Sequence, residues 1–404
     1  MKILFVTGLY PRAAEAELRS HCTIVPSAAP NVLQWAIIEG LKQNGADFKV
    51  VSYPFLPSYP HGYKKAFTFD DDIELDGEKI GEMRRYTTIP GIKPESIKQD
   101  LTHYIYNWIE RMGIRPEEKF AILTYMQLDY FVEPAVKAKE HFPNMVLGTI
   151  VTDLTEDLLN PVNKPPHLLK RWQIQWNLHC EKQLYKDIDR FFLIAKDMTE
   201  YIPEAVGKSI VMEGIATPKG LENVERQHKT LLYTGHLPQH ACIRDLVDAF
   251  MQTTDPDFRL VICGSGDEEG YVKEKAEEDK RIVFKGIVSH EEAIRLQKTA
   301  TAVINPRKPD ISLTKYSFPS KTMEYLASGT PMIGYRLEGI PEEYYTHFYT
   351  VDAIENEALT TVINKVLTAS DTELREKALA AYRFISEKKN PKTQTARIID
   401  FLNK

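Results

Sequence analysis

Residues 305–334 read NPRKPDISLTKYSFPSKTMEYLASGTPMIG, and this stretch decides how the rest of the chain is interpreted. The apolar run at 301–304 before it is typical of a buried parallel strand. Pro319 begins a predicted helix that ends at Gly329, and Pro331 starts the next strand. A strand, a loop and a helix N-terminus bring free backbone N–H groups and the helix dipole together, so the pattern predicts an anion site in an α/β fold.

Positive charge gathers around this predicted helix start. Arg307, Lys308, Lys315 and Lys321 are close in sequence, and Glu324 is the one acid of the helix. An isolated carboxylate one turn inside a cationic pocket suits the hydroxyl pair of a ribose. A surface loop with solvated lysines beside an ordinary helix explains the same residues, and the stretch alone does not decide between the two interpretations.

Length and composition exclude several classes of protein. A chain of 404 residues predicts two or three domains, and 43% apolar with 27% charged residues is typical of a soluble globular protein. The net charge of −6 argues against a general nucleic-acid binder. Four widely spaced cysteines indicate free thiols in a reducing cytoplasm. No apolar run approaches the roughly 18 residues of a transmembrane helix, so any membrane contact, at the inner face, is expected to be peripheral.

The strand and helix pattern occurs in two halves. In the first half we expect parallel strands at 2–7, 48–53, 120–126, 145–153 and 190–194, the last of these closing that half. Residues 68–82 are acidic and are predicted to be solvated. Residues 215–228 form the predicted linker, after which strands are expected at 229–235, 258–264 and 281–286 with helices between them. The pattern predicts an α/β protein with two doubly wound parallel sheets.

Glycines end several of these strands. Gly8, Gly235, Gly264 and Gly286 stand where a ligand lies along the carboxyl edge of such a sheet. Asp153 ends another strand and is a candidate site residue, as are His21 and Tyr125. A structural role is the alternative for each of these three.

Two further segments are open to two interpretations. The Pro- and aromatic-rich segment 54–67 suits contact with a substrate or a membrane surface, or an insertion packed on its own domain. The helix expected at 167–185 carries Trp172 and Trp176 beside Lys170 and Arg171, which suits an interfacial face. Packing of the helix with snorkelling cations is the alternative.

Several well-defined motifs are absent from the sequence. It contains no GxxxxGK[ST], GxSxG or HExxH, and Gly264-Ser265-Gly266 lacks the third glycine of a dinucleotide loop. A basic, glycine-edged crevice in the second half instead suggests a nucleotide donor there. The partner substrate is then expected in the first half, with the reaction in the cleft between them.

The segment YSFPSKTMEYLASGTPMIG at 316–334 resembles the signature of bacterial polysaccharide-assembly glycosyltransferases. LLYTGHL (231–237), FRLVICGSGD (258–267), IVFKGIVSHEE (282–292) and TAVINPR (301–307) support the resemblance. The chain is similar to retaining, family 4-like enzymes of the GT-B fold. This implies two Rossmann-like domains facing a central cleft, with residues 1–205 binding the acceptor and 206–385 the nucleotide-sugar. A helix within 386–404 is then expected to pack back toward the N-terminal domain.

The resemblance also implies a UDP- or GDP-sugar donor, a glycan, lipid-linked or small-molecule acceptor, hexosyl transfer with retention, and no metal or other cofactor. Glu324 is implied to bind the donor ribose, Lys321 the diphosphate, and the loop after Gly286 the base. The donor-binding residues implied are Gly8, Gly235, His236, Gly264, Ile287, Tyr316, Ser317, Phe318, Pro319, Ser320, Lys321 and Glu324. The catalytic candidates are Arg307, Lys321 and Asp153.

The chain departs from the family pattern in two places. Tyr316 stands where the first Glu of a Glu-x7-Glu motif is common, and His236 and Ala241 stand near positions that often hold Arg and Lys. Arg307, with Arg244, is the predicted source of the missing charge. The alternatives are a GT-B sugar-nucleotide epimerase or phosphorylase, and a non-catalytic nucleotide-sugar-binding or partner subunit of the same fold.

Overall fold

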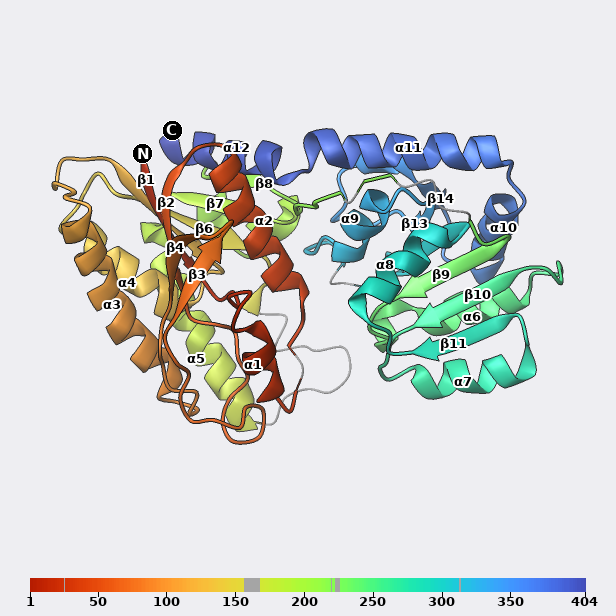
Figure 1. Ribbon diagram of the computed structural model, residues 1–404, viewed down its shortest axis with the longest axis horizontal. Coiled ribbons are helices and arrows are strands. Elements are labelled where there is room, and N and C mark those ends of the chain that lie inside the picture. The colour runs from red at the N-terminus through yellow and green to blue at the C-terminus, as the bar shows by residue number, and fades with distance from the viewer. Residues whose placement is uncertain (25, 156–167, 219, 222–225, 312–313) are drawn as a thin grey trace. The chain divides into compact units, whose positions relative to one another are not determined.

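The computed structural model describes residues 1–404 except 25, 156–167, 219, 222–225 and 312–313 (Figure 1). The chain forms two compact units. Of the described residues, unit 1 comprises 1–155, 168–215 and Pro391–Lys404, and unit 2 comprises those within Ala216–Asn390. The chain therefore passes between units after Ile215 and after Asn390, whereas the sequence-based boundaries were placed after 205 and 385.

Unit 1 is built on an eight-stranded sheet in the order β3-β4-β2-β1-β5-β6-β7-β8. All neighbours are parallel except β3 and β4. Its strands are β1 (Lys2–Thr7), β2 (Asp47–Ser52), β3 (Asp71–Leu75), β4 (Glu78–Met83), β5 (Phe120–Tyr125), β6 (Val146–Val151), β7 (Arg190–Leu193) and β8 (Ser209–Val211). Its helices are α1 (Glu15–Ser20), α2 (Ala29–Gln43), α3 (Lys93–Arg111), α4 (Asp129–Lys139), α5 (Leu168–Leu184) and α12 (Pro391–Asn403).

The C-terminal helix α12 packs beside α2 in unit 1 (Figure 1). Its buried Ile398 and Leu402 join one apolar cluster with Trp35 of α2 and with Phe5 and Leu123 of the central strands. A Cβ on Gly40 of α2 would lie 2.1 Å from the Oγ1 of Thr395. The glycine therefore allows the two helices to touch, and the last turns of the chain complete the core of the first unit.

Unit 2 is built on a six-stranded parallel sheet in the order β11-β10-β9-β12-β13-β14. Its strands are β9 (Thr230–Thr234), β10 (Arg259–Cys263), β11 (Ile282–Gly286), β12 (Ala302–Asn305), β13 (Met332–Tyr335) and β14 (Tyr349–Val351). Its helices are α6 (Ile243–Met251), α7 (Glu269–Glu278), α8 (His290–Thr299), α9 (Ser320–Ala327), α10 (Asn356–Leu367) and α11 (Asp371–Lys388). The chain order reverses at β9, where doubly wound sheets bind ligands.

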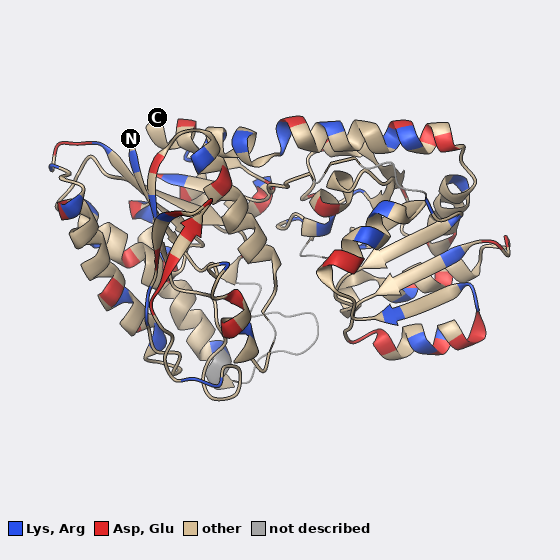
Figure 2. Cartoon of the chain, viewed as in Figure 1, with Lys and Arg blue, Asp and Glu red and all other residues tan. Residues whose placement is uncertain are grey.

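The acidic segment at 68–82 is a hairpin, which corrects its interpretation as solvated chain. Ile73, Leu75 and Ile80 alternate inward and are buried, while the acids between them face outward, visible in red in Figure 2. Asp76 and Gly77 both have positive φ, at 54° and 78°, as a tight two-residue turn requires. Composition alone misled the prediction, because period-2 alternation is the stronger signal.

The sequence predicts that the strand at 190–194 is the last of the first half, and this prediction is wrong because another strand follows β7. Residues 209–211 form β8, which pairs in parallel with β7. The predicted linker at 215–228 therefore starts almost directly after a strand, and its residues 219 and 222–225 lie outside the described residues.

The Pro- and aromatic-rich segment 54–67 packs largely on its own domain. It contains no helix or strand, and Leu56 and Tyr63 are buried. In contrast, Trp172 and Trp176 of α5 are 67% and 57% exposed, whereas Ile174 and Glu181 of the same helix are buried, so α5 packs on unit 1 while its two indoles face outward. Among the described residues, no helix has the length and apolar character needed to cross a membrane.

Candidate functional site

Three glycines in unit 2 line the carboxyl ends of β9, β10 and β11. The N–H of Gly235 donates to the carbonyl of Cys263 at 2.9 Å, and that of Gly264 donates to Gly286 at 2.7 Å. A Cβ on Gly264 would lie 1.7 Å from the carbonyl oxygen of Gly235. Backbone therefore packs on backbone along this edge, and no larger residue fits at position 264.

Helix α9 begins beside this glycine edge. Pro319 is its N-cap and makes no side-chain capping hydrogen bond. Lys321, Glu324 and Tyr325 share one face because they are three and four residues apart. The Tyr325 hydroxyl accepts from the Thr234 N–H at 3.0 Å and lies 3.1 Å from the Thr234 carbonyl. This buried contact fixes the helix against the end of β9.

The Lys321 side chain lies across Gly235. A Cβ on that glycine would be 2.0 Å from Cε and 2.6 Å from Nζ of the lysine. The ammonium group is 5.9 Å from the ring centroid of Tyr233 and 5.6 Å from that of Tyr325. Burial lowers the pKa of Lys321, and the nearby Glu324 charge acts in the opposite direction. Among the described residues no carboxylate forms an ion pair with it, so its charge remains available for an anion.

The Glu324 carboxylate is exposed but is held by a buried neighbour. The side-chain amide of Gln297, from α8, donates to Glu324 Oε1 at 2.5 Å and to Thr234 Oγ1 at 2.9 Å. Gln297 is 2% exposed. One carboxylate oxygen is thus oriented by the protein, while the exposed side chain presents acceptors to the outside, as recognition of a diol requires.

The predicted cations differ in their surroundings. Burial, followed by the charge of Arg307, lowers the pKa of His240, which places Arg307 close to the loop after β9. Lys308 instead pairs with Asp245 of α6 at 2.5 Å. Arg244 pairs with the buried carboxylate of Glu268. Lys308 and Arg244 are therefore engaged within unit 2.

The loop before α9 is anchored by its own residues. Phe318 is 7% exposed and packs on the Tyr344 ring at 5.2 Å between centroids. A Cβ on Gly339 would lie 2.2 Å from the Ser317 carbonyl oxygen. Pro319 is buried too, Tyr316 and Ser317 are half-buried, and Ser320 is exposed. The Phe318 side chain is thus committed to packing, and this loop offers backbone and small polar groups at its surface.

The remaining donor-side candidates lie near strand ends. Ile287 follows β11 and is 80% exposed. The main-chain carbonyl of His236 accepts from the Tyr233 hydroxyl at 2.7 Å, which fixes the turn after Gly235. Unit 2 therefore brings together Gly235, His236, Gly264, Arg307, Lys321 and Glu324.

The predicted residues of the first half lie in unit 1. Gly8 is buried, its N–H donates to Gln34 Oε1 at 2.7 Å, and a Cβ there would lie 2.3 Å from the Phe55 ring. Its amide is thus already engaged. Asp153 follows β6, and the Thr152 hydroxyl donates to its carboxylate at 3.2 Å.

His21 and Tyr125 also have packing partners. The His21 ring meets Tyr63 edge-on with centroids 6.1 Å apart, and Tyr125 is 1% exposed against Phe55. Both contacts match the structural alternative for these residues.

Sequence reasoning missed Gln297 and Thr234. Neither is part of a recognisable motif, and Gln297 stands among ordinary polar residues of the segment HEEAIRLQKT. The one indication of its role is its burial on the apolar side of an amphipathic helix. A buried side-chain amide needs hydrogen-bond partners, and Gln297 finds them in Glu324 and Thr234. Within the described part of the chain, no group of three or more His, Cys, Asp and Glu side chains is arranged to hold a metal ion.

Known proteins match this chain over one region of its sequence and over the whole of its fold. Residues 228–369 match the family described as Glycosyl transferases group 1. A search of curated proteins found no match. The whole chain is similar in structure to a lipopolysaccharide outer core galactosyltransferase, WaaB, at 14% identity and a TM-score of 0.59, covering 99% of that chain.

Two further solved structures are also similar over all of this chain. They are Alr3699/HepE of Anabaena in complex with UDP, at 15% identity and TM-score 0.61, covering 100% of that chain, and sucrose-phosphate synthase of Thermosynechococcus elongatus, at 16% and 0.64, covering 98%. The chain has the GT-B fold. The expectation of two Rossmann-like α/β domains is confirmed. The region that matches the family extends from β9 to α10 of unit 2.

Proposed function

We propose that this chain is a retaining glycosyltransferase that moves a sugar from a UDP- or GDP-sugar to a glycan, lipid-linked or small-molecule acceptor. The observation that carries the proposal is the α9 arrangement, in which Lys321 crosses Gly235 and Gln297 orients Glu324. The similar Alr3699/HepE, solved with UDP and with UDP and glucose, supports a nucleotide-sugar donor.

In this proposal each group of unit 2 has one task. Glu324 accepts hydrogen bonds from the ribose diol, and the first-turn amides of α9 bind the diphosphate with Lys321. Arg307 adds positive charge near the loop after β9, where the leaving diphosphate develops negative charge. Half-buried Tyr316 cannot supply a carboxylate to the donor sugar, so that contact falls to backbone N–H groups or another side chain.

The acceptor is assigned to unit 1. Asp153 stands at the carboxyl end of β6, where binding sites lie in parallel sheets, and is the proposed acceptor-side residue.

We also propose that cationic side chains, not a metal ion, neutralise the diphosphate. Turnover in excess EDTA should then equal turnover in added Mg²⁺, and loss of turnover with EDTA that Mg²⁺ restores would refute this part.

Peripheral membrane contact is part of the proposal because of the exposed face of α5. Leu168, Trp172 and Trp176 follow one another at four-residue spacing, and the two indoles stack with centroids 6.2 Å apart. Exposed tryptophans suit the lipid headgroup region. Co-sedimentation with anionic vesicles should fall in a Trp172→Ala/Trp176→Ala variant, and equal co-sedimentation would oppose membrane contact.

The direct test is nucleotide release from a panel of UDP- and GDP-sugars, with and without acceptor glycans. We expect slow release of UDP or GDP from one donor, lost in Lys321→Ala. A non-catalytic nucleotide-sugar-binding subunit is the second candidate, favoured by Tyr316 at the usual Glu position and by Arg244 being paired with Glu268. Donor binding without any release would support that candidate.

A further inference from the structure

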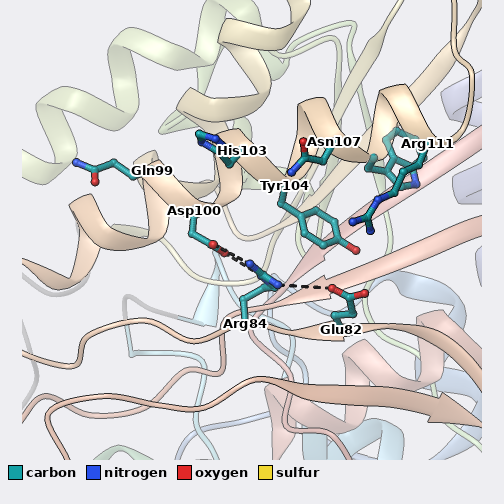
Figure 3. A pocket seen from close by; sticks show the side chains of 9 residues that line it. Glu82, Arg84, Gln99, Asp100, His103, Tyr104, Asn107 and Arg111 are labelled. Atoms are coloured by element: carbon teal, nitrogen blue, oxygen red, sulfur yellow. Dashed lines mark hydrogen bonds and ion pairs between the residues drawn. The ribbon is translucent and has the colours of Figure 1, made fainter.

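A polar trough lies on unit 1 between α3 and the strand β4 (Figure 3). Its volume is about 450 Å³. Glu82 of β4 and Arg84, directly after that strand, form one side, and α3 forms the other. Pockets of this size hold small organic ligands, but the usual ones are lined mainly by apolar side chains. Here every lining side chain carries a hydrogen-bonding group, so a polar ligand fits the trough better than an apolar one.

The spacing along α3 explains how these side chains gather. His103, Asn107 and Arg111 are each four residues apart and follow one ridge of the helix, while Tyr104 and Trp108 follow the next ridge. From His103 to Arg111 the ridge extends about 12 Å along the helix axis. The trough therefore offers a row of polar groups rather than a single point of contact.

The charges of the trough balance one another. Arg84 binds both carboxylate oxygens of Asp100, at 2.9 and 3.0 Å, and the Tyr53 hydroxyl donates to the same carboxylate at 2.7 Å. Glu82 lies 3.6 Å from Arg84. Asp100 holds the pKa of Arg84 above its usual range. An anionic ligand would face the carboxylates of Glu82 and Asp100 as well as the guanidiniums of Arg84 and Arg111, so the trough, with two charges of each sign, is not a dedicated anion site.

Several donors and acceptors of the trough have no protein partner. Within the described residues, the side chains of His103, Tyr104, Asn107 and Arg111 make no hydrogen bond. The Nε1 of Trp108 is buried without a partner although that residue is only 5% exposed. Burial raises the pKa of Tyr104 to about 12, so its hydroxyl remains protonated at neutral pH. His103, Asn107 and Arg111 are exposed, so a ligand in the trough can reach their donors and acceptors.

We propose that this trough binds a saccharide. A sugar ring is neutral and carries many hydroxyls that both donate and accept, which matches mixed amide, imidazole, guanidinium, carboxylate and phenol groups. A peptide strand is a poorer fit because β4 is already paired on both sides, by β3 and β2, and offers no free strand edge. The trough includes neither the donor residues of unit 2 nor Asp153, the proposed acceptor-side residue, so it does not depend on the proposed function.

The test uses the full chain and four probes: D-glucose, D-galactose, N-acetyl-D-glucosamine and maltotriose. Saturation-transfer difference NMR should show transfer to at least one of them without nucleotide present. Transfer to none of the four overturns the proposal. The signal should persist in excess UDP and in Glu324→Gln. A signal that UDP or this substitution removes would place the sugar at the donor residues instead.

Two substitutions localise the binding. Asn107→Leu and Arg111→Leu should each weaken sugar binding about fivefold, the effect of about 1 kcal/mol per hydrogen bond. Both side chains are exposed, so folding should be retained, which far-UV circular dichroism checks. Glu110→Ala, exposed on the same helix outside the trough, is the matched control. Equal affinity in all three variants would refute the location.

An indole reporter gives a second, independent readout. The chain has four tryptophans, so its indole N–H region of a ¹⁵N correlation spectrum should contain four peaks. Trp108→Phe identifies the Trp108 peak. The sugar that receives saturation should shift this peak in the wild-type chain, and a peak that does not move at saturating sugar would count against the trough.

Discussion

Gln297 donates a hydrogen bond to Glu324 at 2.5 Å and links two helices of unit 2. The same amide donates to Thr234 at the end of β9, and the Thr330 hydroxyl donates to the Gln297 carbonyl at 2.7 Å. A buried residue with no task in chemistry thus fixes the position of the carboxylate that the proposed function assigns to the ribose. Gln297 is a positioning residue for the donor.

Replacing Gln297 should therefore weaken donor binding. In Gln297→Leu the Glu324 carboxylate loses its oriented partner, and we expect a rise in the nucleotide dissociation constant of about tenfold, as for loss of a hydrogen bond to a charged group. Isothermal titration calorimetry with UDP and GDP measures this. Glu291→Ala, exposed on the same helix, is the control. Equal affinities of the two variants would show that Gln297 serves packing alone.

Gly235 should tolerate no side chain. Its φ is +151° and a Cβ would lie 2.0 Å from Lys321 Cε, so Gly235→Ala displaces the lysine. We expect nucleotide affinity to fall at least as far as in Lys321→Ala. The exposed Gly270, where a Cβ would meet no atom within 4 Å, provides the matched Gly→Ala control. Full affinity in Gly235→Ala would mean that the lysine does not contact the nucleotide from this position.

The titration of Lys321 should appear in the pH dependence of nucleotide binding. Burial lowers its pKa, so the charged form is lost at a lower pH than for an ordinary lysine, whose pKa is about 10.4. Binding of UDP or GDP should therefore weaken as pH rises through the lowered pKa, and bound diphosphate should release less readily below it. In Lys321→Arg the dependence should flatten, since a guanidinium stays charged. Identical pH profiles would exclude Lys321 as the titrating group.

Unit 1 should depend on the last helix of the chain. Leu402 is fully buried in the same apolar cluster as Trp35, so Leu402→Ala should destabilise unit 1 by about 2–5 kcal/mol. Urea unfolding followed by tryptophan fluorescence measures this change. The neighbouring Asn403→Ala, at an exposed position, should have little effect. Similar unfolding midpoints for both variants would contradict the packing described for α12.

The sequence predicted the strands and helices around α9 well because their signals are local. Proline at the helix start and Gly329 after its end mark α9 without reference to the rest of the fold. The β3–β4 hairpin was missed because acidic composition was given more weight than the alternation of Ile73, Leu75 and Ile80. Local sequence patterns therefore predict the helices and strands correctly where the spacing of apolar residues is considered. Composition alone does not predict them.

The candidate site was predicted in part for the same reason. Lys321 and Glu324 stand in one motif, so their shared helix face follows from spacing. Gln297 reaches Glu324 only because α8 packs beside α9, and nothing in its own segment encodes that contact. The engagement of Arg244 by Glu268 and of the Gly8 amide by Gln34 likewise arises from tertiary packing.

The measurement closest to the central claim is calorimetric titration of the full chain with UDP and with GDP, in wild type, Lys321→Ala and Glu324→Gln. The account predicts that wild type binds one of the two nucleotides and that both substitutions weaken it. Absence of binding for both nucleotides, or unchanged affinity in the two variants, would contradict the assignment of the α9 residues to a nucleotide-sugar donor.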